Sequence, residues 1–234
     1  MSQPTPRLSR RLLAWLLPLT VTVIVATLTA LAWPARTLDP DDPLGPTSFS
    51  EPLDFLIRDL NNPLALGSVD APVRIFVHSD YQCDLCAVWS HTTLPEIVNT
   101  YVNSGKVRLV WQSNALVGSD SERATRAAYA AGLQGRFSDY HAGLFPNGSK
   151  RTTDQLTDDA LFALAREIGL NEPQFHSDFY SVKTAQALLQ NVNESRMFDI
   201  TSIPAIIING EHLEQTLSTE ETFSLIEDNL RVPQ

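Results

Sequence analysis

The chain has 234 residues, a formal net charge of -10, 43% hydrophobic residues and 19% charged residues. This composition is typical of a folded globular protein, and the acidic balance argues against a nucleic-acid binder, which normally has a basic face. The chain contains two cysteines, Cys83 and Cys86, which are too few for a disulfide-dense small domain or for a complete tetrahedral zinc site. The pair therefore needs a specific explanation.

A charge-free segment lies near the N-terminus. Arg7, Arg10 and Arg11 precede it, and it runs from Leu12 to Trp33. As a helix it would be about 33 Å long, close to the ~30 Å apolar thickness of a bilayer. The arginines predict a cytoplasmic N-terminus and an exported remainder, so residues 12–33 are expected to be a signal anchor in the lipid bilayer. A signal peptide cleaved near Ala32 is the alternative, because Ala30-Leu31-Ala32 has the small-x-small form of a cleavage site.

The segment after the anchor is rich in proline and acidic residues, which is typical of an extended tether. Three parts are therefore expected. Residues 1–33 contain the cytoplasmic arginines and the anchor, residues 34–66 form a tether and lead-in, and residues 67–234 form the folded domain.

The first part of the domain alternates strands and a helix. Val73–Ser79 is rich in β-branched and aromatic residues and predicts a buried strand. A helix is expected from Asp84 to Val102, with a kink at Pro95, which has no backbone N–H to donate. Val107–Trp111 predicts a second strand, parallel to the first because a helix connects the two.

A helical block at about residues 119–198 follows. Its predicted helices are Ser121–Leu133, Arg136–Phe145, Thr153–Ile168 and Pro173–Phe198. The segments predicted after it are a strand at Ala205–Ile208, a hairpin turn at Asn209-Gly210, a short strand and a helix at Ser218–Leu230. This order predicts an α/β domain that is interrupted by a helical insertion.

The cysteine pair lies where the first strand gives way to the first helix. In Cys83-Asp84-Leu85-Cys86, the first cysteine meets unpaired backbone N–H groups and the positive end of the helix dipole, which favour a thiolate. Cys86 is one turn further along and can resolve a mixed disulfide on Cys83. A purely structural disulfide is a weaker alternative, because the loop that it closes is very short. A metal site with His78 and His91 is another, but no second cysteine pair completes it, so no metal is expected.

Further motifs follow the cysteine pair in a fixed order. Together with the cysteine pair they are Asp80-Tyr81-Gln82-Cys83, Thr93–Ile97, Gly105–Val110, Gln134–Phe137, Tyr140-His141, Leu144-Phe145, Thr201–Ala205 and Ile208–Gly210. With these motifs the sequence, from about Gly67 to Leu230, resembles the DsbA-like thiol–disulfide oxidoreductases of the thioredoxin superfamily, in their membrane-anchored bacterial form. The resemblance implies an α/β thioredoxin fold with an inserted helical subdomain, preceded by the N-terminal transmembrane helix.

The resemblance also implies a role for each residue of the site. Cys83 would be the exposed nucleophile and Cys86 its buried partner, and this redox-active disulfide would serve without a cofactor. Pro204 would follow a cis peptide bond beside the disulfide, and the Ile203 backbone would offer strand-like hydrogen bonds to a substrate peptide. The substrates would be unfolded exported proteins, and a membrane-embedded redox partner would recycle the pair.

Three departures from the family pattern concern redox tuning, and one of them is Ile203, which is bulky and apolar in front of Pro204. Asp84 and Leu85 stand where strongly oxidising members have a proline and a histidine or aromatic residue. The Asp84 carboxylate would disfavour a nearby thiolate, which predicts a less oxidising pair; alternatively, Asp84 points to solvent as a favourable first-turn acid. Val77 stands where many relatives place a buried acid, and the neighbouring His78 is expected to pack on the other face of the strand.

The positions of a few residues beside the cysteines predict their environment. Asp80 is a candidate for local polar chemistry or for fixing the turn before the helix. Tyr81 is expected to be exposed beside the active-site turn, and Ile203 to cover the sulfur. Trp89 could line a peptide groove, whereas core packing is expected for Trp111.

The sequence therefore predicts an exported enzyme that donates the Cys83–Cys86 disulfide to unfolded proteins on the extracytoplasmic side of the cell membrane. One alternative is a reductase or isomerase in the same compartment, which Asp84 favours. Another is a thioredoxin-fold binding or chaperone module with a vestigial cysteine pair. The reduction potential distinguishes the disulfide donor from the reductase or isomerase. The activity of a Cys83→Ser variant decides whether the chain is instead a binding or chaperone module.

Overall fold

The structure is a computed structural model that describes residues 61–213 and 218–231. Within these ranges no helix is long and apolar enough to cross a membrane. The predicted anchor at residues 12–33 lies outside them and stays a prediction. The regular elements are β1 Ala65–Leu66, β2 Val73–Ser79, α3 Asp84–Ile97, β3 Val107–Ser113, α4 Gly118–Leu133, α5 Phe137–Leu144, α6 Asp158–Ile168, α7 Glu172–Phe179, α8 Val182–Met197, β4 Ala205–Ile208, β5 Glu211–Leu213 and α9 Thr219–Arg231.

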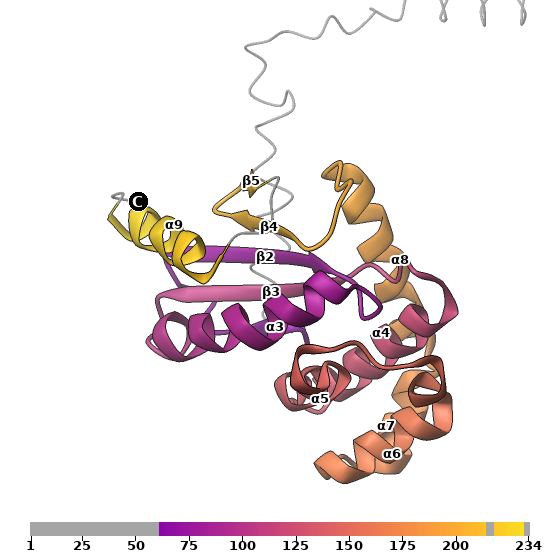
Figure 1. Cartoon of the computed structure of the whole chain (residues 1–234). Coiled ribbons are helices and arrows are strands. Elements are labelled where there is room, and N and C mark those ends of the chain that lie inside the picture. Colours follow the sequence, from indigo (N-terminus) through magenta and orange to yellow (C-terminus); the bar gives the residue numbers. More distant parts are fainter. Residues whose placement is uncertain (1–60, 214–217, 232–234) are drawn as a thin grey trace, which may run out of the picture. The chain divides into compact units, whose positions relative to one another are not determined.

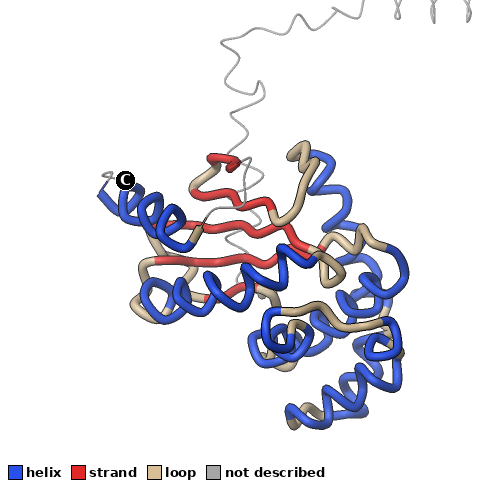
Figure 2. Tube along the Cα trace, viewed as in Figure 1, coloured by secondary structure: helices blue, strands red, loops and turns tan. Residues whose placement is uncertain are grey.

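The strands form a mixed sheet in the order β1-β3-β2-β4-β5 (Figures 1 and 2). β2 and β3 run parallel from the pair Val73–Val107 to the pair Ser79–Ser113, which confirms the predicted crossover. β4 pairs antiparallel with β2, and β5 pairs antiparallel with β4 through the predicted Asn209-Gly210 turn. Because the parallel strands end together, the turn after β2 and the turn after β3 lie at the same edge of the sheet.

The first strand of the sheet was not predicted. Ala65 and Leu66 pair antiparallel with Val110 and Leu109 of β3, and Leu64 beside them is buried. A two-residue strand has no alternation that a sequence pattern could reveal. The fold therefore begins before residue 67, inside the segment that was expected to be a lead-in.

The alternating side chains of the sheet divide between two cores. Val73, Ile75 and Val77 of β2 point into the larger core, which α3 and α9 cover (Figure 1). Phe76 belongs to a smaller cluster on the opposite face, with Val110 and Ile207. A strand whose side chains are buried on both faces is expected to read as a continuous apolar run, which is why β2 was recognisable in the sequence.

The helix that follows β2 keeps its predicted start but changes its form near its end. α3 runs from Asp84 to Ile97, and Val98–Val102 continues it as a π-helix. Pro95 lies inside α3 and supplies no N–H to the helical ladder, and the wider turn begins three residues later.

The predicted helical insertion consists of α4 to α8, between β3 and β4 in the chain (Figures 1 and 2). Two of its predicted helices are each split by a capping residue. Thr157 accepts a hydrogen bond from the Ala160 N–H and starts α6, and a short 3₁₀ turn at Thr153–Leu156 precedes it. Ser181 accepts from the Thr184 N–H and starts α8 after α7 has ended. These hydroxyl caps favour a new helix start over continuation of the previous helix.

Candidate active site

The two cysteines lie at the first turn of α3 and form a disulfide. Cys83 is the N-cap residue, and its Sγ accepts a hydrogen bond from the Cys86 N–H at 3.1 Å. Cys83 is half-buried, whereas Cys86 is fully buried in the larger core. An incoming thiolate can therefore approach the Cys83 sulfur, and the helix N-terminus stabilises negative charge on this sulfur when the disulfide opens.

The loop before β4 lies directly beside Cys83. The Ile203–Pro204 peptide bond is cis, and the Ile203 carbonyl oxygen lies 3.9 Å from the Cys83 Sγ. Pro204 is buried, and Ile203 is half-buried and packs against the larger core together with Cys83. β4 and α3, which are more than a hundred residues apart in the chain, thus meet at the sulfur because β4 pairs with β2.

Asp80 holds the turn that leads from β2 into the cysteine pair. Its side chain is fully buried, and its carboxylate accepts from the backbone N–H groups of Gln82 at 2.7 Å, Leu116 at 2.6 Å and Val117 at 3.1 Å. It also accepts a hydrogen bond from the Ser121 hydroxyl. Of the two predicted roles, these contacts favour fixing the turn, since the carboxylate joins the turn after β2 to the turn after β3.

The prediction for Tyr81 was wrong. The side chain is 1% exposed, and its ring packs against Phe145 with a centroid distance of 5.2 Å. Its hydroxyl lies 3.1 Å from the Nδ1 atom of His141, so α5 of the insertion anchors the residue two positions before Cys83. Burial raises the pKa of the Tyr81 phenol well above its ordinary value. The error arises because a residue beside an exposed turn was expected to be exposed, whereas the insertion covers this side of the turn.

The two residues between the cysteines point outward. Leu85 is 59% exposed, and the Asp84 side chain is 75% exposed. Asp84 is not alone, however, because its Oδ2 atom accepts a hydrogen bond from Lys150 Nζ at 2.9 Å. Next to this contact, Gln82 Nε2 donates to the Arg151 carbonyl oxygen at 3.1 Å. The loop after α5 therefore borders the redox turn and places the positively charged Lys150 side chain beside the Asp84 carboxylate.

The remaining predicted residues lie in the interior. His78 is fully buried on the face opposite to Val77, with its Nδ1 atom 3.1 Å from the Ser195 hydroxyl, which confirms its expected packing. Trp111 is 1% exposed, as expected. Trp89 is 2% exposed and packs near Trp111 with a centroid distance of 6.2 Å, so it does not line an open groove.

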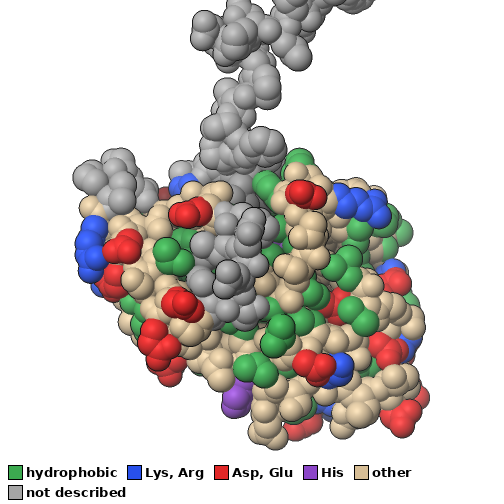
Figure 3. Space-filling model, turned by 45° about the horizontal axis from the view of Figure 1, so that its top comes forward, with side chains coloured by type: hydrophobic (Ala, Val, Ile, Leu, Met, Phe, Trp, Pro, Cys, Tyr) green, Lys and Arg blue, Asp and Glu red, His purple; other side chains and the backbone are tan. Residues whose placement is uncertain are grey.

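The exposed side chains around the redox turn include large apolar residues. Leu85 and Val88 extend from the first two turns of α3, and Leu116 and Val117 extend from the loop that Asp80 holds. Each of the four is more than half exposed. Apolar and acidic side chains share the face of the molecule in Figure 3, with fewer basic side chains among them. An apolar border next to a reactive sulfur suits the exposed apolar residues of an unfolded chain.

Sequence reasoning missed Lys150 and His141 as neighbours of the site. Both come from the insertion, and they contact Asp84 and Tyr81 across 66 and 60 positions of the chain. No local pattern marks either residue. Tyr140-His141 appears among the motifs of the resemblance, but nothing in the sequence assigns the histidine a partner.

Comparison with known proteins places this geometry in a family. The family model described as Thioredoxin matches residues 59–228. A probable disulfide bond formation protein D from Bacillus cereus is 26% identical over 150 residues, which cover 62% of this chain and 69% of the relative. Oxidised BdbD from Bacillus subtilis superimposes with a TM-score of 0.65 at 22% identity, covering 74% and 94% of the two chains. Chlamydia trachomatis DsbA gives a TM-score of 0.61 at 18% identity, with 73% and 93% covered. With its cysteine pair at the start of α3, the chain belongs to the thioredoxin family as a DsbA-like thiol–disulfide oxidoreductase.

Proposed function

We propose that this protein oxidises pairs of thiols in unfolded exported proteins by transferring its Cys83–Cys86 disulfide to them. The observation that carries the proposal is the arrangement of the pair: a half-buried Cys83 at the N-terminus of α3 and a fully buried Cys86 behind it. The name of the Bacillus cereus relative, a probable disulfide bond formation protein, supports the same direction.

The exchange proceeds in two steps. A substrate thiolate attacks the Cys83 sulfur, the bond between the two enzyme sulfurs breaks, and Cys86 leaves as a thiolate that takes up a proton. The second substrate thiolate then attacks the substrate sulfur of the mixed disulfide, and Cys83 leaves as a thiolate. The substrate loses two electrons, and the enzyme disulfide gains them as a dithiol. The Cys86 N–H and the helix N-terminus stabilise the departing Cys83 thiolate.

The cellular setting follows from the sequence features. The arginines before residues 12–33 support a single-pass protein in the cell membrane, with the domain on the extracytoplasmic side. There a membrane-embedded redox partner would reoxidise the Cys83–Cys86 dithiol, because each turnover consumes one disulfide. The apolar border of Leu85, Val88, Leu116 and Val117 offers a docking place for extended, unfolded substrate chains.

A reductase or isomerase remains the second candidate, and Asp84 is the observation that favours it. A carboxylate beside Cys83 disfavours the thiolate and hence the reduced form, which lowers the reduction potential. Lys150 offsets part of the effect of Asp84 on the thiolate, because its ammonium group lies 2.9 Å from the same carboxylate.

The test uses the oxidised full chain and a reduced, unfolded ribonuclease whose activity returns only when its disulfides form. We expect ribonuclease activity to return in proportion to the disulfide supplied, and a pre-reduced sample of the same chain to have no effect. With a ribonuclease that already contains disulfides, the Cys83 thiolate of the Cys86→Ala variant attacks a substrate disulfide, and one substrate sulfur leaves as a thiolate. The mixed disulfide should accumulate, visible by non-reducing electrophoresis, because the resolving thiol is gone. The Cys83→Ser variant should form none.

The direction of electron flow in cells is measured separately, by trapping free thiols with an alkylating reagent. An oxidase is expected to hold Cys83 and Cys86 mostly as a disulfide. A pair found mostly as a dithiol would support the reductase instead. Full biological activity of the Cys83→Ser variant would contradict both enzyme functions and leave the binding or chaperone module.

A further inference from the structure

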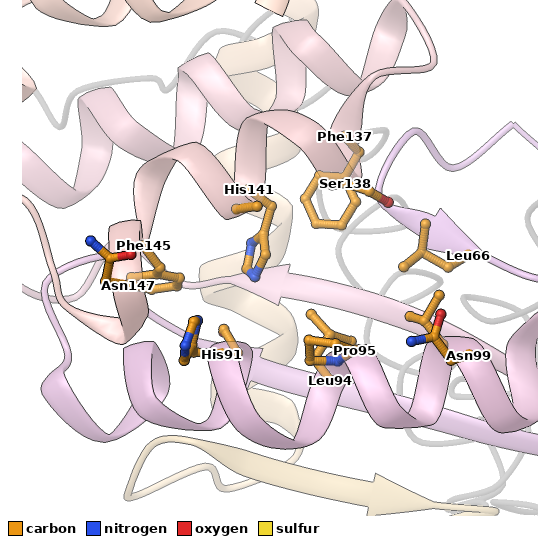
Figure 4. Close-up of a pocket in the computed structure, with 13 residues that line it drawn as sticks. Leu66, His91, Leu94, Pro95, Asn99, Phe137, Ser138, His141, Phe145 and Asn147 are labelled. Carbon is orange, nitrogen blue, oxygen red and sulfur yellow. The ribbon is translucent and has the colours of Figure 1, made fainter.

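A pocket of about 410 Å³ lies behind the redox turn, between α3 and α5. In Figure 4, Leu94 and Pro95 line it from α3, Phe137 and Phe145 from α5 and the residue after it, and Leu66 from β1. Neither cysteine lines it. A pocket of this size with mostly apolar walls can bury a small organic molecule.

Two buried polar groups in its wall find no hydrogen-bond partner among the described residues. The His141 ring points from α5 toward α3 in Figure 4. The residue is only 3% exposed, and its Nε2 atom has no hydrogen-bond partner among the described residues. Ser90 on α3 is 8% exposed, and its hydroxyl is also unpaired. A buried polar group that has lost its hydration and has no partner is unfavourable, so a binding partner for these two atoms would stabilise the molecule.

The charge of the pocket restricts what it can hold. The described residues that line it include no Asp, Glu, Lys or Arg. Burial lowers the pKa of His141 to about 3, so its imidazole is neutral at physiological pH. A charged ligand would therefore lose its hydration without gaining a counter-charge.

The chemistry of the two unpaired atoms restricts the ligand further. A hydroxyl group both donates and accepts, so it can pair with the Ser90 hydroxyl and with either tautomer of the neutral His141 ring. The rings of Phe137, His141 and Phe145 offer edges and faces that an aromatic ligand can pack against.

We propose that the pocket between α3 and α5 binds a flat, uncharged aromatic molecule that carries one hydroxyl group, with this hydroxyl bonded to His141 Nε2 and Ser90 Oγ. Leu94, Pro95, Phe137 and Phe145 enclose the ring. The site is separate from the cysteine pair, and its existence does not depend on the direction of the redox reaction.

The test measures binding of 2-naphthol to the full chain by equilibrium dialysis, with naphthalene and 2-naphthoate as comparison compounds. Ala142→Trp places an indole in the pocket wall at an exposed position, and Ser90→Ala removes one polar partner. Ala163→Trp makes the same change at an exposed position of α6 that does not line the pocket. The amount of 2-naphthol that Ala142→Trp retains measures binding outside the pocket, and it is subtracted from the amount that the wild type retains.

We expect 2-naphthol to bind the wild type and Ala163→Trp equally and to lose its specific binding in Ala142→Trp. Ser90→Ala and the replacement of 2-naphthol by naphthalene should each weaken binding about ten-fold, because each removes a hydrogen bond to a buried group. The 2-naphthoate anion should not bind. Equal retention of 2-naphthol by the wild type and Ala142→Trp would overturn the proposal, as would naphthalene binding as tightly as 2-naphthol.

Discussion

At the scale of single residues, the charge of the redox motif depends on a pair of side chains. Asp84 lies between the cysteines, and Lys150 reaches it from the loop after α5, with 39% of the lysine side chain exposed. Both side chains are solvated, so their pairing contributes little to stability. Their effect is instead on the nearby thiolate, which the carboxylate disfavours and the ammonium group favours.

We predict that Lys150→Met lowers the reduction potential of the Cys83–Cys86 pair, because the reduced form loses a nearby cation. Asp84→Asn should raise the potential, because a nearby anion is removed. Each change is expected to be about 10–20 mV, since one solvated charge at a few ångströms is worth about 1 kcal/mol or less and 30 mV corresponds to about 1.4 kcal/mol. The measurement is equilibration with a glutathione buffer.

Arg136→Met is the matched control, since Arg136 pairs with Asp139 on the surface of the insertion. It should leave the potential unchanged. The effect of Lys150→Met should also shrink in an Asp84→Asn background, because Asp84 holds the lysine beside the pair. A Lys150→Met potential equal to that of the wild type would show that the ion pair does not tune the reaction.

At the scale of elements, the insertion is packed tightly against the first described residues of the chain. Gly132, near the end of α4, is buried, and a Cβ atom there would collide with the carbonyl oxygen of Pro63. Pro63 precedes Leu64 and β1, which pair with β3 at the edge of the sheet. Glycine at this position therefore allows α4 to lie close to the edge of the sheet.

We predict that Gly132→Ala lowers the free energy of unfolding by about 1–2 kcal/mol. Alanine gains up to about 1 kcal/mol of helix propensity, but overpacking against backbone costs more, about 1–3 kcal/mol. The matched control is Gly143→Ala in α5, where the added Cβ would lie 2.8 Å from the Cδ1 atom of the flexible Leu164 side chain. Urea unfolding should show a smaller loss for this variant, and equal losses would contradict the role assigned to Pro63.

At the scale of the whole molecule, the sheet and the insertion share one hydrophobic core. Leu109 and Trp111 of β3 belong to the same cluster as Tyr140 and Leu161 of the insertion. His141 lies in this shared region, with its ring 4.2 Å from the Trp111 ring between centroids. We therefore expect the described residues to unfold together, with His141 as a buried neutral group that senses pH.

We predict that the wild type loses stability as pH falls from about 6.5 toward 3, the interval between the ordinary pKa of histidine and the pKa of about 3 for His141. In this interval the unfolded chain binds a proton that the folded chain does not, so the free energy of unfolding falls with pH. At pH 4 the loss from this residue is about 3 kcal/mol, because pH 4 lies about 2.5 units below the ordinary pKa of 6.5 and each unit is worth ~1.4 kcal/mol.

The control for this prediction is His141→Asn, which retains a side-chain amide that can face Tyr81 and lacks the titrating group. The difference between the two proteins isolates His141 from other groups, such as Glu194, whose pKa burial raises and which acts in the opposite direction. Urea unfolding at pH 7 and pH 4, followed by tryptophan fluorescence, measures it. The same loss in both proteins would contradict the prediction.

The sequence by itself determined the features that depend on neighbours along the chain. Cys83 at a helix start, Val73–Ser79 as a buried strand and the Asn209-Gly210 hairpin were all predicted, because caps, alternation and turn propensities act over a few residues. The order of the motifs along the chain also indicated the family. Together these features predict the fold class and the redox pair.

The tertiary structure alone decided which distant groups meet at the site. Tyr81 was expected in solvent and is buried against the insertion, Asp84 is paired with Lys150, and the His141 and Ser90 side chains line a common pocket. The physical reason is that burial and pairing depend on how α5 and its following loop pack against α3. That packing joins residues some 50 to 70 positions apart, and no period or cap in the sequence encodes it.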